Sequence, residues 1–147
     1  KGFLARFDEF KTFFHGHTYT GNPLACAAAI ANLDVFAEER VIEGSGEKIE
    51  RLTQGLTPIA SLNHVGEVRQ RGFMVGIELV ADRETKALYP PAERIGHKVI
   101  LEARKRGLII RPLGDVIVLM PPLCITTEEI DRLCEITYES IRAVAGE

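Results

Sequence analysis

The stretch VGEVRQRGFMVGIELV, residues 65–80, decides what kind of fold this chain adopts. After Gly72, apolar residues recur at every second position, which is the spacing of a strand with one buried face. Gly72 can turn the chain back on the segment from Val65 to Gln70, so the two segments are expected to pair as a hairpin. The alternating apolar residues are Phe73, Val75, Ile77 and Leu79.

The residues after this hairpin predict a helix and a second pair of strands. Ile95, Val99 and Ala103 share one helical face, and Gly107 is expected to end that helix. Two strands should follow, Leu108–Arg111 and Val116–Met120, joined by the turn-forming string PLGD.

The chain is expected to end in another helix. Thr126 and Glu129 have capping-box spacing at its start. Its expected buried stripe consists of Ile130, Leu133, Cys134, Ile141 and Val144.

Two helices are expected before the hairpin, one from about Pro23 to Arg40 and one that follows Gly44 and Gly46 and ends near Pro58. The order of elements is therefore ααββαββα. This order predicts an α+β fold, an antiparallel sheet with helices on one face preceded by a helical connector. A joint near Ser61–Gly66 should divide the chain into the connector, residues 1–64, and the sheet domain, residues 65–147.

The segment HGHTYTGNPLACAAA, residues 15–29, indicates an anion-binding loop at the start of the first helix. Asn22 is a favoured N-cap residue and Pro23 suits the first helical position. The free amides and the positive end of the helix dipole favour a phosphate or carboxylate. Thr18, Tyr19 and Thr20 place three hydroxyl groups close by.

Composition excludes several classes of protein. With 147 residues and 46% hydrophobic content, the chain can bury roughly 70% of its unfolded surface. The net charge is only -3 and the basic residues are scattered, which argues against nucleic-acid binding. The sequence has no membrane-spanning run and no signal-peptide pattern, so a cytoplasmic location is expected.

The cysteines and histidines do not predict a metal site. Cys26, Cys124 and Cys134 are interpreted as small buried hydrophobic residues, because their spacing fits neither a disulfide framework nor a zinc site. His15 and His17 alternate as metal ligands can, but no third ligand lies nearby in sequence. His97 is expected on a solvated helix face.

The loop segment HGHTYTGNPLACAAA resembles class III aminotransferases, fold type I enzymes that use pyridoxal 5'-phosphate. The resemblance continues through VGEVRQRGFMVGIELV, YPPAERIGHKVILEARKRGLIIRPLGD and VIVLMPPLCITTEEID, and so covers nearly the whole chain. Within this class the chain is most similar to the biotin-synthesis enzymes that convert 7-keto-8-aminopelargonate to 7,8-diaminopelargonate. The resemblance implies a homodimer that takes its amino group from adenosylmethionine or lysine.

The resemblance also implies roles for four residues. Arg111, within RPLGD, would bind the carboxylate of the keto acid, and Gly16 would contact substrate through its backbone. His17 and Thr18 would contact the cofactor phosphate, although many relatives have proline where His17 stands. From spacing alone, a structural ion pair of Arg111 with Asp115 or Glu78 is the alternative.

The family's Schiff-base lysine lies upstream of the threonine loop, and no lysine here stands in a matching segment. The chain is therefore expected to be the C-terminal part of the enzyme, inactive alone and without catalytic residues of its own. Two other functions remain open: another class III enzyme acting on ω-amino acids, and a non-catalytic α+β module that binds a ligand or regulates a partner.

Overall fold

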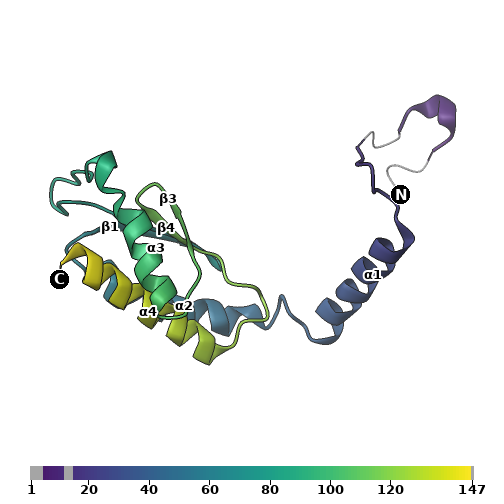
Figure 1. Ribbon diagram of the computed structural model, residues 1–147. Coiled ribbons are helices and arrows are strands. Elements are labelled where there is room, and N and C mark those ends of the chain that lie inside the picture. Colours follow the sequence, from purple (N-terminus) through teal and green to yellow (C-terminus); the bar gives the residue numbers. More distant parts are fainter. Residues whose placement is uncertain (1–4, 12–14, 147) are drawn as a thin grey trace. The chain divides into compact units, whose positions relative to one another are not determined.

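A computed structural model describes residues 5–11 and 15–146. The chain divides into two compact units, Lys1–Glu39 and Arg40–Glu147, and each is described by itself. The ribbon in Figure 1 labels most of the helices and strands.

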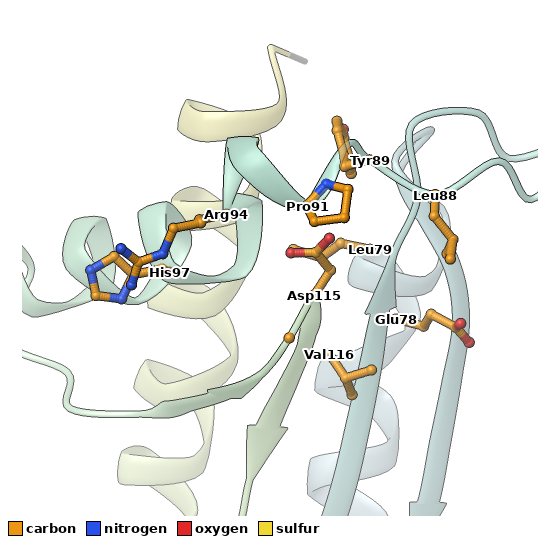
Figure 2. A pocket seen from close by; sticks show the side chains of 10 residues that line it. Glu78, Leu79, Leu88, Tyr89, Pro91, Arg94, His97, Asp115 and Val116 are labelled. Atoms are coloured by element: carbon orange, nitrogen blue, oxygen red, sulfur yellow. The ribbon is translucent and has the colours of Figure 1, made fainter.

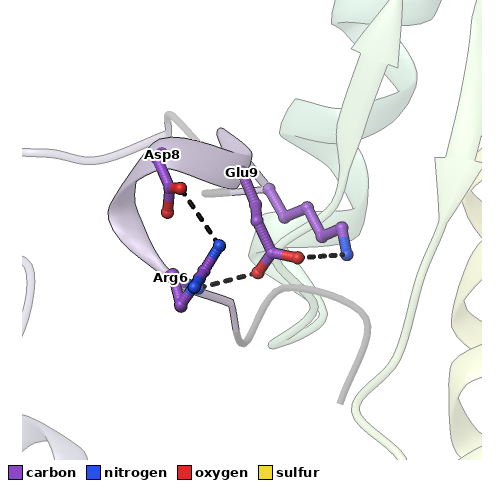
Figure 3. A network of polar contacts seen from close by, with 4 residues as sticks. Arg6, Asp8 and Glu9 are labelled. Atoms are coloured by element: carbon purple, nitrogen blue, oxygen red, sulfur yellow. Dashed lines mark hydrogen bonds and ion pairs between the residues drawn. The ribbon is translucent and has the colours of Figure 1, made fainter.

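The first unit contains a short 3-10 helix, η1 (Phe7–Glu9), and the helix α1 (Pro23–Glu38). Around η1, Glu9 accepts hydrogen bonds from the Arg6 amide and from Lys11, and Arg6 pairs with Asp8 (Figure 3). These charged side chains are exposed and close a local turn. Exposed pairs of this kind contribute little to stability.

Helix α1 begins where the sequence predicts, at Pro23, with Asn22 as its N-cap. None of its residues is buried, and its large apolar side chains, such as Leu24 and Leu33, are exposed. The prediction that Cys26 is buried is therefore wrong for this chain, because Cys26 lies on a helix without a buried residue and is itself exposed.

The second unit is an α+β domain, as the sequence predicts. Its strands are β1 (Val65–Arg71), β2 (Met74–Leu79), β3 (Arg111–Leu113) and β4 (Val116–Leu119). They form one antiparallel sheet in the order β1-β2-β4-β3. Its helices are α2 (Ser45–Ala60), α3 (Ile95–Lys105) and α4 (Thr127–Ala145), with a short η2 (Pro91–Glu93) before α3.

The core lies between the sheet and these helices. Helix α4 contacts both α2 and α3, α2 contacts β1, and α3 contacts β3 and β4 (Figure 1). Ile77, Ile117 and Leu119 from the sheet are fully buried, as are Leu52 from α2 and Ile130 from α4. The predicted capping box at Thr126 and Glu129 is present.

One strand is shifted toward the C-terminus relative to its predicted position. We expected a strand over Leu108–Arg111, whereas β3 covers Arg111–Leu113 and pairs with β4 through Arg111 opposite Val118. The turn is confined to Gly114 and Asp115, with Gly114 at a φ of 61°. Cross-strand pairing with β4, which periodicity does not report, sets the position of this edge strand.

The boundary between the two compact units falls between Glu39 and Arg40 in the sequence, and not at the joint expected near Ser61–Gly66. The physical reason is that α2 buries Leu52, Leu56 and Ile59 against α4 and β1 and so packs with the sheet. The division into residues 1–64 and 65–147 stays a prediction about functional parts of the chain.

Candidate functional site

The loop before α1 is a tight turn held by three short contacts. The Thr20 amide donates to the His17 carbonyl oxygen at 2.9 Å, and the Asn22 amide donates to the Tyr19 carbonyl oxygen at 3.2 Å. The His17 amide donates to the Thr20 hydroxyl at 2.6 Å. Neither the amide nor the hydroxyl of Thr18 makes a hydrogen bond within the described chain. Thr18 therefore presents two donors to a ligand.

The helix terminus itself offers fewer donors than we expected. The Asn22 side chain accepts from the Leu24 and Ala25 amides at 3.0 and 3.2 Å. The Cys26 amide bonds to the Asn22 carbonyl oxygen, and Pro23 has no N–H. Free amides of the first turn are thus not available, and an anion here would rely on the loop donors and the helix dipole.

Arg111 is the first residue of the edge strand β3, and it is exposed. Its guanidinium makes no hydrogen bond or ion pair with any residue that the structure describes. Both partners of the alternative ion pair bind elsewhere: Glu78 accepts from Arg69 at 3.0 Å, and Asp115 accepts from the Gly96 amide at 3.0 Å. The guanidinium is therefore free to bind a carboxylate.

The surroundings of Arg111 are apolar. It borders a cavity of about 470 Å³ whose lining includes Ile109, Leu113 and Met120. These three side chains are exposed. A free guanidinium beside exposed aliphatic side chains suits a ligand that joins a carboxylate to a methylene chain.

The four residues with implied roles fall into two groups. Gly16, His17 and Thr18 lie in the loop of the first unit, whereas Arg111 lies in the second. All four are exposed. Each group is a separate candidate subsite, one for an anion and one for a carboxylate.

A second cavity, of about 440 Å³, lies at the other end of the β3–β4 hairpin (Figure 2). His97 and Asp115 line it together with the apolar Leu79 and Leu88. His97 is half-buried there, which corrects the expectation of a solvated face. Sequence periodicity missed this cavity, because its walls come from four separate segments.

The remaining nucleophile and metal candidates carry no site. Burial raises the pKa of the Cys134 thiol to about 11, so it is protonated at neutral pH. Cys124 is exposed, against our expectation, because it lies in the turn before α4. The His15 and His17 rings pack edge to face. Within the described residues no group of three or more His, Cys, Asp or Glu could hold a metal.

Comparison with known proteins decides the family. The family described as aminotransferase class-III matches residues 5–141. The chain belongs to the class III aminotransferases. Among the helices of the described residues, none has the length and apolar character that spanning a membrane requires.

Individual class III aminotransferases are similar over almost all of this chain. The adenosylmethionine-8-amino-7-oxononanoate aminotransferase of Nitratidesulfovibrio vulgaris is 61% identical over 143 residues, 97% of this chain and 26% of that protein. The crystal structure of the enzyme of that name from Methanocaldococcus jannaschii has a TM-score of 0.86 at 49% identity, and the match covers 97% of this chain and 32% of that one.

A more distant neighbour is a PMP-bound form of an aminotransferase from Vibrio fluvialis. Its TM-score is also 0.86, at 30% identity over 95% of this chain and 31% of that one. The chain thus spans between a quarter and a third of the length of these proteins. Its fold matches the corresponding part of the fold of pyridoxal-phosphate-dependent transaminases.

Proposed function

We propose that this chain is the C-terminal part of an aminotransferase that converts 7-keto-8-aminopelargonate to 7,8-diaminopelargonate in biotin synthesis. The observation that carries the proposal is the free, exposed guanidinium of Arg111 in a chain 61% identical to an enzyme named for this reaction. Adenosylmethionine and lysine are the candidate amino donors.

The loop before α1 fits the phosphate of pyridoxal 5'-phosphate. The amide and hydroxyl of Thr18 are donors without a partner, and the α1 dipole places positive potential at the same end. His17 would add a contact from its backbone or ring. When bound, the cofactor supplies the electron sink for amino transfer. This chain's own part is to hold the phosphate.

Arg111 would hold the far end of the keto acid. A guanidinium binds a carboxylate through two parallel hydrogen bonds, which fixes the direction as well as the position of the substrate. The apolar side chains beside it would contact the aliphatic chain of the pelargonate. Gly16 would contact substrate through its backbone.

The ω-amino-acid alternative has weaker support. A solved omega transaminase from Pseudomonas jessenii is 29% identical to this chain, about half the identity of the biotin-pathway relative. The non-catalytic alternative gives the loop of residues 15–22 no role. The homodimer and the cytoplasmic location remain predictions.

The test is amino transfer by a full-length aminotransferase that carries this segment. We expect 7,8-diaminopelargonate from 7-keto-8-aminopelargonate with adenosylmethionine or lysine as donor. Turnover of ω-amino acids together with no product from the keto acid would favour the alternative enzyme.

The chain of residues 1–147 alone gives a second test. No lysine in it stands in a segment matching the family's cofactor lysine, so we predict no turnover and no cofactor fixed to one lysine by borohydride. Fixation at a single lysine would contradict the assignment of this chain to the C-terminal part.

A further inference from the structure

We propose that Asp115 is a positioning residue for Arg111, acting through a contact between the β3–β4 turn and the start of α3. The inference rests on the proposed role of Arg111 as the carboxylate-binding residue. It concerns a different residue, to which the proposed function assigns no contact with substrate or cofactor.

The start of α3 lacks a cap from its own sequence. Its N-cap residue is Arg94, which has a left-handed φ of 50° and makes no side-chain capping bond. The acceptor comes from 19 residues further along the chain: the Asp115 carboxylate accepts from the Gly96 amide at 3.0 Å. A carboxylate at this end of a helix is also favoured by the helix dipole.

The same residue is fixed to the sheet through its backbone. The Leu79 amide, at the end of β2, donates to the Asp115 carbonyl oxygen at 2.9 Å. Asp115 therefore joins β2 through its main chain and α3 through its side chain. In Figure 2 it lies at the start of β4, beside the segment that leads into α3.

Gly96 allows this contact by its size. A Cβ at position 96 would collide with the Gly114 carbonyl oxygen and lie 3.1 Å from the Asp115 Cα. Helix and turn are in direct backbone contact, so any larger residue at position 96 would push the turn away.

The position of Arg111 depends on this turn because β3 is an edge strand. It has three residues and, among the described strands, pairs with β4 alone. Arg111 lies opposite Val118, and Leu113, two residues on, lies opposite Val116 next to the turn. Since no described strand lies on the outer side of β3, the contact between the turn and α3 is a second support that holds the hairpin. A small displacement of a binding group can cost much of its effect.

The experiment uses a full-length aminotransferase carrying this segment. It compares kcat/KM for the keto acid with kcat/KM for its amide, which lacks the carboxylate. A general loss of structure lowers both values, whereas a displaced guanidinium lowers only the first. We expect Asp115→Ala to reduce the acid-to-amide ratio by about 3- to 10-fold.

Three further variants sharpen the comparison. Asp115→Asn keeps an oxygen that can accept from the Gly96 amide, so its ratio should stay near that of the parent. Gly96→Ala displaces the turn from the other side and should lower the ratio even if Asp115→Ala does not fold. Asp131→Ala breaks an ion pair between α2 and α4, remote from the hairpin, and should leave the ratio unchanged.

Arg111→Ala separates this inference from the proposed function. If it lowers the ratio while Asp115→Ala and Gly96→Ala do not, the positioning role is wrong and the binding role stands. If Arg111→Ala leaves the ratio unchanged, the binding role is wrong and the positioning role is wrong with it.

Discussion

Arg111 and Thr18 separate substrate binding from cofactor binding at the level of single side chains. In the full-length enzyme, Arg111→Ala should remove charged hydrogen bonds worth roughly 1.5 to 3 kcal/mol, a loss of about 10- to 150-fold in keto-acid affinity. Cofactor affinity should barely change. Thr18→Ala should weaken cofactor binding and spare the keto acid. Titration of each variant with each ligand measures both effects.

A different result would identify Arg111 as a structural residue. In that case Arg111→Ala would lower the melting temperature sharply and leave keto-acid affinity unchanged in the folded fraction.

The ion pair between Arg51 and Asp131 predicts a dependence of stability on pH. Two guanidinium nitrogens of Arg51 lie 2.6 Å from the Asp131 carboxylate oxygens, and these hydrogen bonds lower the pKa of Asp131. The stabilisation is therefore complete above the ordinary aspartate pKa of about 3.9 and is lost as the pH falls through the lower folded pKa.

Urea unfolding of the parent and of Asp131→Asn at neutral pH and near pH 3 measures this effect. The gap in unfolding free energy should be small, because both groups are half-exposed, and it should shrink at the acid pH and in high salt. A gap that is the same at both pH values would assign the effect of the substitution to packing.

At the level of elements, the contact between α2 and α4 depends on Gly55. A Cβ there would lie 2.6 Å from the Cys134 Sγ, so Gly55→Ala should cost about 1 to 3 kcal/mol of stability. Cys134→Ala removes the nearest atom and should recover part of that loss. Gly46→Ala is the matched control, because it lies in the same helix with no atom within 4 Å. Chemical denaturation compares the variants, and an equal effect at both glycines would contradict the close contact.

Local signals predicted most of the elements, and contacts distant in sequence account for what they missed. The 65–79 hairpin and the capping box at Thr126 follow from periodicity and caps within a few residues. The start of β3 depends on pairing with β4, and Asp115 finds Gly96 from 19 residues away. Neither the strand pairing nor this hydrogen bond can be predicted from a pattern of neighbouring residues.

The sequence predicted the candidate site less completely than the fold. The free guanidinium of Arg111 and the donors of Thr18 agree with the roles that the family resemblance implies. The free amides that the residue pattern predicted at the start of α1 are absent, since the Asn22 side chain already accepts hydrogen bonds from two of them. A helix start whose amides bind the N-cap side chain and a helix start whose amides are free for a ligand have the same sequence pattern.

For the whole molecule, all core residues of the described chain belong to the second unit. A protein of residues 40–147 should therefore keep cooperative thermal unfolding, with a melting temperature within about 4 °C of the longer chain. A protein of residues 65–147 should lose it, because Leu52, Leu56 and Ile59 of α2 would be missing from the core. Calorimetry of both proteins tests this, and a cooperative transition in residues 65–147 would instead support the division at residue 64.

The three cysteines make the chain ready for site-directed spectroscopy. Cys26 on α1 and Cys124 before α4 are exposed, one in each compact unit, while Cys134 is buried with its pKa raised to about 11. Maleimide chemistry at neutral pH should label the first two and spare the third. Two spin labels placed without any mutation would then report the distance between a site in the first unit and a site in the second, before and after pyridoxal 5'-phosphate is added.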